Sequence, residues 1–466
     1  MTHTLEQLRS GNLLGISRLK LACGLTEFPG EILDLADTLE ILDLSGNDLS
    51  ALPDALPLLT RLRVIFCSDN QFTELPEILG RCPQLTMIGF KANRIHTVPA
   101  RSLPQKLRWL ILTDNRIEEL PAEIGQCQHL QKLMLAANRL RALPVELAAC
   151  TRLELLRIAA NRLSELPGWL LSMPRLTWLA YAGNPFCEER EFAALANTPL
   201  AGIAWDQVQI HHKLGEGASG VIHQAQHRMG DVSQSVAVKL FKGAVTSDGL
   251  PLSEMAACIS AGEHPNLIPL QGRVKDHPSG VQGLVMALID AQFRDLAGPP
   301  SLESCTRDIY AAGKRFDLEP MLGIAQGIAS AARHLHSRGI MHGDLYGHNI
   351  LHCDRGRTLL GDFGAASYFD PEALHAHMLQ RLGVRAFGLL MEELIERCNV
   401  PPGSRHVMER LAQLKCACLH VEIESRPLFE EVETVLSELV MAGKTLPANP
   451  GKTAGDIRPT NLMKMA

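Results

Sequence analysis

Apolar residues recur along the first 205 residues in one repeated arrangement. The arrangement is complete at Leu39-x-x-Leu42-x-Leu44-x-x-Asn47-x-Leu49-x-x-Leu52-Pro53, and its steps are 22 or 23 residues. Its asparagine returns six times, as Asn70, Asn93, Asn115, Asn138, Asn161 and Asn184. Alternating apolar positions predict a short strand with one buried face, and a single strand cannot bury that face alone. With a shorter unit at residues 19–29, we expect about eight stacked units and a cap in residues 1–205.

The asparagine and the Leu-Pro pair of each unit have structural explanations. A small amide can satisfy backbone groups where the chain turns away from the strand. Proline then restricts the residue before it and sets the direction of the exit. We therefore assign these residues no role beyond folding.

The period and the pattern resemble the leucine-rich repeat. The resemblance implies an α/β solenoid whose outward strand positions form a concave face for a protein substrate or regulator. These positions are small or apolar from Phe66 to Met134, which favours a partner surface; a tolerated mixture of surface residues explains them equally well. An arginine follows the asparagine in four units, and a solvated charged edge explains this row better than an acidic partner does (Arg94, Arg116, Arg139, Arg162).

Composition narrows the class of protein. The net charge of −6 and the lack of a dense Lys/Arg block argue against binding to nucleic acid. The 12 cysteines contain no C-x-x-C pair, which argues against a zinc framework and favours a reducing compartment. Neither a signal-peptide core nor an apolar run of about eighteen residues occurs. We expect a soluble, cytoplasmic protein with no membrane span.

A glycine-rich loop opens the second half of the chain. Alternating apolar residues precede and follow it, so its context is strand–loop–strand, whereas the dinucleotide fold needs strand–loop–helix. Glycines allow backbone N–H groups to lie close to phosphate. The loop has the form G-x-G-x-x-G-x-V and consists of Leu214, Gly215, Glu216, Gly217, Ala218, Ser219, Gly220 and Val221.

A lysine and a glutamate follow the loop, and each lies in an apolar segment where its charge needs an opposite charge nearby. Lys239 ends the apolar strand 236–239, and Glu254 lies in an alanine-rich helical segment. A carboxylate on an apolar helix face needs a cation, so we expect the two to pair. The structural alternative is an exposed lysine at the edge of a sheet.

Three polar residues between 342 and 364 can perform chemistry together: Asp344, Asn349 and Asp362. Apolar pairs at 350–351 and 359–360 flank turn residues and predict a two-stranded hairpin that brings Asn349 and Asp362 to one edge. Carboxylate and amide oxygens are suited to Mg²⁺ that also binds phosphates. Taken singly, these residues would be explained as turn formers.

Residues 206–440 resemble a protein kinase domain, an α+β bilobal fold. The matching motifs are the glycine-rich loop, V-A-V-K ending at Lys239, H-P-N at 264–266, His342-Gly-Asp-Leu with Asn349, D-F-G at 362–364, and Arg426-Pro427. The resemblance implies that Asp344 orients and deprotonates a hydroxyl, with Lys239 and Asn349 also catalytic. Asn349 and Asp362 would hold Mg²⁺, for which Mn²⁺ could substitute. ATP would contact the loop, Lys239 and Glu254, and also Ala237, Met286 as gatekeeper, and Ala287 to Ile289.

The chain departs from the kinase pattern at several positions. Gly343 replaces the arginine of H-R-D, and Tyr346 and His348 stand where a lysine or arginine faces the transferred phosphate. No A-P-E motif closes the activation segment, and Gly383 replaces the aspartate of the later D-x-x-x-x-G. We therefore expect a shortened peptide-docking region and no control through the H-R-D arginine.

The leading interpretation is an ATP- and Mg²⁺-dependent protein kinase, of the Ser/Thr type, acting in signalling with the repeats as its recognition module. The alternative is an ATP-binding pseudokinase scaffold that acts through the repeats. A third interpretation is a kinase for a small molecule. Residues 441–466, which contain Pro and Gly, are expected to form a flexible tail.

Overall fold

The computed structural model describes residues 2–197, 200–217, 219–243, 245–246 and 248–444. The chain divides into two compact units, Met1–Phe186 with Ser247–Gly249 and Cys187–Thr246 with Leu250–Ala466. We expected the boundary at residue 205. The division comes earlier because helix α2 (Glu188–Asn197) packs against helix α3 (Pro251–Ala261), and strand β9 (Gly202–Ala204) pairs with strand β13 (Leu270–Lys275) of the second unit.

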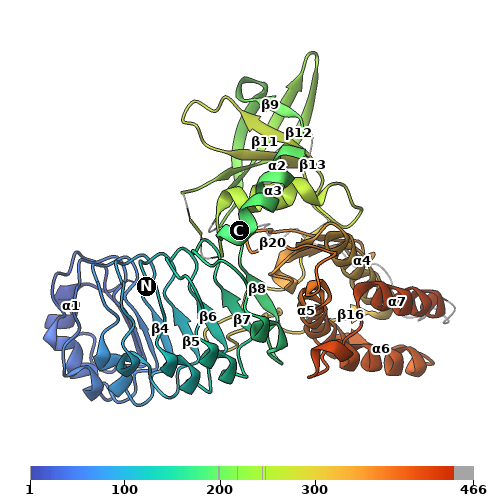
Figure 1. The fold of residues 1–466 in the computed structure, drawn as a ribbon. Coiled ribbons are helices and arrows are strands. Elements are labelled where there is room, and N and C mark those ends of the chain that lie inside the picture. Colours follow the sequence, from blue (N-terminus) through green and yellow to red (C-terminus); the bar gives the residue numbers. More distant parts are fainter. Residues whose placement is uncertain (1, 198–199, 218, 244, 247, 445–466) are drawn as a thin grey trace. The chain divides into compact units, whose positions relative to one another are not determined.

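The first unit is the predicted solenoid (Figure 1). After the short helix α1 (Leu5–Arg9), eight strands pair in parallel and in chain order. The middle residue of each strand, such as Leu42 or Leu110, is fully buried. The strands are β1 (Arg18–Lys20), β2 (Ile41–Asp43), β3 (Val64–Phe66), β4 (Met87–Gly89), β5 (Trp109–Ile111), β6 (Lys132–Met134), β7 (Leu155–Arg157) and β8 (Trp178–Ala180).

Short 3₁₀ turns, and not α-helices, connect the strands. Proline precedes most of these turns in an extended conformation, as at Pro121 with φ −68° and ψ 146°. A repeat of 22 or 23 residues leaves about five residues for this segment, which suits a single 3₁₀ turn. The turns are η1 (Gly30–Leu35), η2 (Leu56–Leu58), η3 (Glu77–Arg81), η4 (Ala100–Ser102), η5 (Ala122–Gln126), η6 (Val145–Ala149) and η7 (Gly168–Ser172).

The repeated asparagines form a ladder of side-chain hydrogen bonds, as their spacing predicts. Asn115 Oδ1 accepts from the backbone N–H of Ile95 at 2.9 Å. Its Nδ2 donates to the carbonyls of Phe90 and Leu112 at 2.9 and 3.0 Å. One amide therefore joins two neighbouring turns of the solenoid and satisfies backbone groups that the strands leave unpaired.

The outward strand positions are more enclosed than the sequence indicates. A Cβ on Gly89 would lie 2.5 Å from the Phe66 ring, so that ring lies against the neighbouring strand. Trp109 Nε1 donates to Met134 Sδ at 3.4 Å. Arg157, in the same row, is 1% exposed, and its Nε donates to Asp248 of the same unit at 2.6 Å. The predicted apolar surface is thus half-buried, not open.

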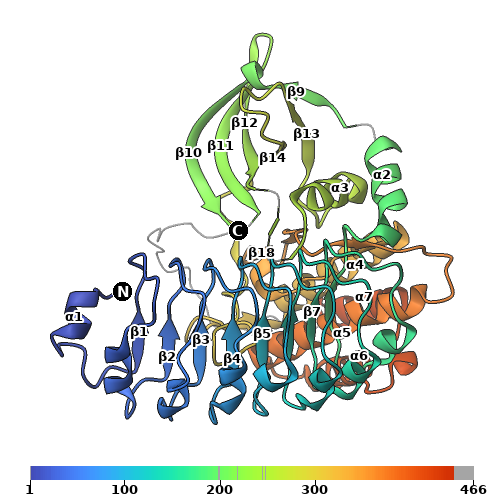
Figure 2. The ribbon, with the colours of Figure 1, turned by 60° about the vertical axis from the view of Figure 1, so that its left-hand side comes forward.

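A six-stranded sheet forms one part of the second unit. Its strand order is β10-β11-β12-β14-β13-β9, with β10 (Val208–Glu216), β11 (Gly220–Met229), β12 (Val232–Phe241) and β14 (Gly283–Ala287) antiparallel to their neighbours. Ile203 of β9 is 4% exposed in the core of this sheet. Helix α3 packs on the sheet through Met255 and Ile259 (Figure 2).

The other part is mainly helical. It contains α4 (Leu318–Ser337), α5 (Ala376–Glu396), α6 (Arg405–Cys418) and α7 (Phe429–Lys444). Short strand pairs complete it: β15 (Arg294–Asp295) with β18 (Ile350–His352) and β19 (Thr358–Leu360), β16 (Phe316–Asp317) with β21 (Cys398–Asn399), and β17 (Ile340–Met341) with β20 (Ser367–Tyr368). The predicted tail begins inside α7, and its residues 445–466 lie outside the described part of the chain.

Within the described ranges, no helix has both the length and the apolar character needed to cross a membrane. The same residues contain no group of three or more His, Cys, Asp or Glu that could hold a metal ion. No disulfide bond joins any of the cysteines in the part of the chain that the structure describes.

The asparagine ladder gives a test of repeat stability. Replacing Asn115 by Ala leaves a buried N–H and two carbonyls without their partner, and we expect a loss of about 2–3 kcal/mol in the free energy of unfolding. Urea unfolding followed by tryptophan fluorescence would measure it. Arg116→Ala, at the exposed next position, should change stability by less than about 0.5 kcal/mol. Equal effects of the two substitutions would contradict the ladder.

Candidate active site

Lys239 and Glu254 form a buried ion pair, as predicted. Lys239 lies near the end of β12, and Glu254 lies in the first turn of α3. The Nζ of the lysine donates to Oε1 of the glutamate, and the two side chains are 12% and 2% exposed. The exposed-edge alternative for Lys239 is therefore wrong.

The charge of Lys239 is maintained by carboxylates. Burial alone would lower its pKa, but Glu254 and Asp362 outweigh burial and raise the pKa. The second oxygen of Glu254, Oε2, is buried and accepts no hydrogen bond within the described part of the chain. A cation held in this way is suited to bind phosphate oxygens.

The glycine-rich loop joins two antiparallel strands, β10 and β11. The N–H of Gly217 donates to the carbonyl of Gly220 at 2.9 Å. A Cβ on Gly220 would lie 2.6 Å from the Leu240 carbonyl, so only glycine fits there. Glu216 is paired with Lys213 and Lys242. The strand–loop–strand context is thus confirmed. Ala218 lies outside the described residues. The loop also contains Leu214, Gly215, Ser219 and Val221.

The predicted hairpin follows the catalytic stretch. Strands β18 and β19 pair with Ile350 opposite Leu360. The N–H of Gly361 donates to the carbonyl of Asn349 at 2.9 Å, and His342 Nε2 contacts the carbonyl of Gly361 at 2.9 Å. The hairpin therefore fixes the backbone on both sides of Asp362.

Asp344, Asn349 and Asp362 are brought to one place. Asn349 Nδ2 donates to the carbonyl and to Oδ2 of Asp344, both at 2.8 Å. Asp362 has φ +52°, and its Oδ1 accepts from the N–H of Gly364 at 3.0 Å. The amide nitrogen of Asn349 is occupied in this arrangement, which leaves its Oδ1 as a ligand atom. One amide and one carboxylate oxygen fit Mg²⁺, which takes few protein ligands when it also binds phosphates.

The predicted adenine-side residues lie on neighbouring strands. Ala237 of β12 is opposite Met286 of β14, and Ala287 is opposite Val236. Met286 packs against the cluster that includes Met255 of α3. Ile289, which follows β14, packs instead against the cluster around Phe293 and Leu351.

The backbone conformation at position 343 explains why a glycine is found there. Its φ is +72°, in the left-handed region where a side chain costs about 1–2 kcal/mol. The residue therefore relieves strain in the catalytic stretch at the position where an arginine was expected.

Sequence reasoning missed Asp308, a carboxylate bound to the catalytic stretch. Its side chain is fully buried, its Oδ2 accepts from the N–H of His348 at 3.0 Å, and its Oδ1 lies 2.7 Å from Nδ1 of the same histidine. Burial would lower the pKa of His348, but the bond to Asp308 and the charges of Asp308, Asp344 and Asp362 outweigh it and raise the pKa. No motif in the sequence marks Asp308.

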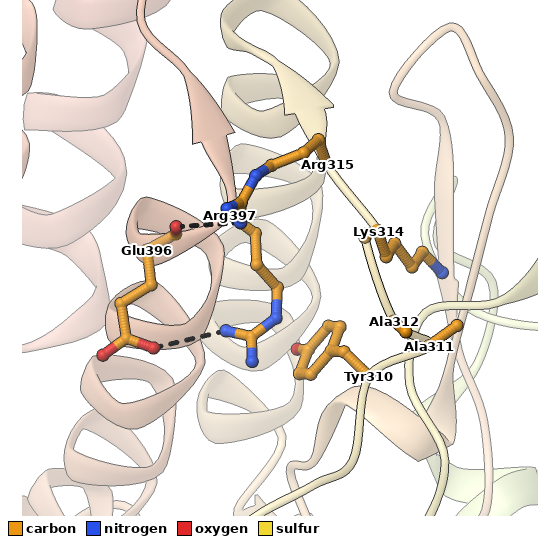
Figure 3. Close-up of a pocket in the computed structure, with 8 residues that line it drawn as sticks. Tyr310, Ala311, Ala312, Lys314, Arg315, Glu396 and Arg397 are labelled. Atoms are coloured by element: carbon orange, nitrogen blue, oxygen red, sulfur yellow. Dashed lines mark hydrogen bonds and ion pairs between the residues drawn. The ribbon is translucent and has the colours of Figure 1, made fainter.

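The Asp308 segment also contacts helix α5 and lines a nearby cavity. Tyr310 OH donates to Glu393 Oε2 at 3.0 Å, and burial raises the pKa of Glu393 to about 7. The adjoining cavity has a volume of about 300 Å³. The Arg397 guanidinium lies 4.0 Å from the Tyr310 ring there and pairs with Glu396 (Figure 3). None of the predicted site residues lines this cavity.

Comparison with known proteins agrees with this geometry. The model of the family described as protein tyrosine and serine/threonine kinase matches residues 208–385. Leucine-rich-repeat models match residues 38–59 and 105–163. The chain is a leucine-rich-repeat region fused to a protein kinase domain. The fold class predicted from the sequence is confirmed.

Similar curated proteins are also kinases, at low identity. Cyclin-dependent kinase 11.1 of Caenorhabditis elegans is 25% identical over 190 residues, which are 40% of this chain and 25% of that protein. A probable serine/threonine-protein kinase of Arabidopsis thaliana is 31% identical over 109 residues, 23% of this chain and 17% of that protein. Cyclin-dependent kinase 11B of Rattus norvegicus is 24% identical over 265 residues, 56% of this chain and 58% of that protein. The matches thus span between 17% and 58% of these relatives.

The Asp308–His348 contact predicts a pH-dependent contribution to stability. A histidine whose pKa is raised on folding stabilises the protein below its unfolded pKa of about 6.5, and this contribution is lost as the pH rises through the folded pKa. We expect Asp308→Asn to lower the free energy of unfolding more at about pH 6 than at about pH 9. Denaturant unfolding at both pH values would measure the difference.

The control is Asp231→Asn, at an exposed position between β11 and β12. Its effect should be small and the same at both pH values. A pH-independent effect of Asp308→Asn would show that the carboxylate does not favour the charged histidine.

Proposed function

We propose that the protein is an ATP- and Mg²⁺-dependent protein kinase that transfers the γ-phosphoryl group to a serine or threonine hydroxyl. The observation that carries this proposal is the joint arrangement of the Lys239–Glu254 pair and the Asp344–Asn349 contact. Both lie in one unit, and the charge of Asp362 acts on Lys239 and on His348.

Each polar residue has a distinct role in this proposal. Asp344 is partly exposed and is held by Asn349, so its carboxylate can orient the acceptor hydroxyl and take its proton. The hydroxyl oxygen forms a bond to the γ-phosphorus as the bond to ADP breaks. Lys239 binds phosphate oxygens, and backbone N–H groups of the glycine-rich loop cover them.

Asn349 Oδ1 and Asp362 would hold the metal ion. When bound, Mg²⁺ supplies positive charge to the phosphate oxygens of ATP. Asn349 is 5% exposed and Asp362 is partly exposed. Asn349 would therefore be the buried metal ligand and Asp362 the accessible one.

The finer parts of the proposal have separate support. Serine/threonine specificity follows the name of the Arabidopsis relative, since the family description covers tyrosine kinases as well. The repeats would recruit a protein substrate or regulator on the partly exposed face that carries Phe66 and Met134. Cysteines without disulfide bonds among the described residues fit a reducing compartment such as the cytoplasm.

A second function is that of an ATP-binding scaffold without transferase activity. It is favoured by the residues at the positions where the kinase pattern has a cation facing the transferred phosphate. Tyr346, 5% exposed, stands where a lysine was expected. His348 can carry a positive charge when protonated, but its ring is committed to Asp308. In this case Lys239 and Asp362 would serve nucleotide binding alone, and the repeats would carry the biological role.

Phosphate transfer from γ-labelled ATP tests the proposal. Full-length protein with Mg²⁺ and a generic protein substrate should transfer label, and Asp344→Ala should lower kcat by about 10²–10⁴-fold, because the general base is lost. Asp362→Asn should abolish Mg²⁺-dependent transfer while its backbone is retained, since Asn tolerates a positive φ.

The control is Asp231→Asn, which should leave transfer unchanged. Thermal stabilisation by ATP without transfer in the wild type would overturn the kinase proposal and favour the scaffold. Transfer that survives both active-site substitutions would place the chemistry elsewhere.

A further inference from the structure

Helix α2 lies outside the matched kinase region and packs beside helix α3, as Figure 2 shows. Helix α3 carries Glu254, the partner of Lys239. We propose that α2 holds the first turn of α3 in the position that pairs Glu254 with Lys239, and that Glu191 and Ser253 are positioning residues for phosphoryl transfer. This inference rests on the proposed kinase function.

The contact that carries the inference is adjacent to Glu254 in the sequence. Ser253 Oγ donates to Glu191 Oε2 at 2.9 Å, and Ser253 is 5% exposed. A hydrogen bond to a charged acceptor is stronger than one between neutral groups. The bond therefore restrains the backbone one residue before the glutamate that pairs with Lys239.

The first turn of α3 has no side-chain N-cap, although Met255 directly after it packs on the sheet. Its N-cap residue, Leu250, makes no side-chain capping bond, and Pro251 follows it. A helix without a side-chain cap leaves its first N–H groups without that partner, and its end frays more easily. Glu191 thus acts on the weaker end of the helix.

The opposite end of α3 is held by the body of the kinase domain. Tyr368 OH donates to Ser260 Oγ at 2.9 Å, and His334 Nε2 lies 2.7 Å from the carbonyl of Ala261. Fixing the last turn alone leaves the first turn free to move about it. Because Glu254 is in the first turn, its distance from Lys239 depends on the contact with α2.

Helix α2 is itself tied to the segment after D-F-G. Arg190, next to Glu191, forms an ion pair with Asp370 at 2.6 Å. Two neighbouring residues of α2 therefore contact α3 and the short segment that leads from Asp362 to α5. Helix α2 can hold the lysine–glutamate pair because it is anchored on the same domain.

The test compares full-length variants at both ends of the contact. Glu191→Ala and Ser253→Ala should each lower kcat/KM for ATP by about three- to tenfold, because the paired state becomes less populated. Glu191→Ala should have less effect in the Ser253→Ala background than in the wild type, since the two residues share one bond. Glu191→Gln, whose amide oxygen still accepts from Ser253, should retain most of the activity.

The matched control is Glu189→Ala, an exposed glutamate of the same helix, which should leave kcat/KM unchanged. Hydrogen exchange of residues 251–261 supplies a readout that needs no catalysis: exchange should become faster in Glu191→Ala and not in Glu189→Ala. If the wild type transfers no phosphate, the proposed function fails while the exchange data still test the contact. Additive effects of the two alanine substitutions, or equal exchange in the two glutamate variants, would overturn the inference.

Discussion

The buried pair of Lys239 and Glu254 is the interaction on which the catalytic unit depends. Removing two charges from water is expensive, and leaving either one alone in the interior is worse. The pair therefore exists only where the β12 strand and the α3 helix meet at the right distance. Packing of Met255 and Ile259 on the sheet and the contacts at both ends of α3 serve this one requirement. Glu254 is directed toward β12, since its Oε1 accepts from Lys239 Nζ and its side chain is 2% exposed.

The departures from the kinase pattern around the catalytic stretch are related to one another. Gly343 adopts a positive φ without strain, so this turn needs less support than one with a side chain would. At Gly383, where a carboxylate was expected, a Cβ would lie 3.1 Å from the His336 ring, and α5 packs closely there. The carboxylate that binds the catalytic stretch comes from Asp308, in a different segment. The catalytic stretch is thus held by a carboxylate that lies outside the predicted motifs.

The sequence predicted the parts of the molecule that follow local rules. Repeat spacing located the strands and the asparagine ladder, and motif order located Lys239, Glu254, Asn349 and Asp362. It did not predict Asp308 or Glu191, because each acts through a partner 40 or 62 residues away and neither lies in a pattern. It also placed the domain boundary at 205. The acidic segment 188–191 has the composition of a cap on the repeat array, and the three residues of β9 are too few to be predicted as a strand.

That shifted boundary changes how the two halves of the chain are connected. A flexible linker would transmit nothing from the repeats to the kinase domain. Here the chain that leaves the last repeat enters a helix bound to α3 and to Asp370, and then a strand that completes the sheet beside Arg273 and Val274. Any force on the start of α2 therefore acts on the helix that carries Glu254. The fusion point, and not only the presence of two modules, therefore places a helix of the second unit beside α3 directly after the last repeat.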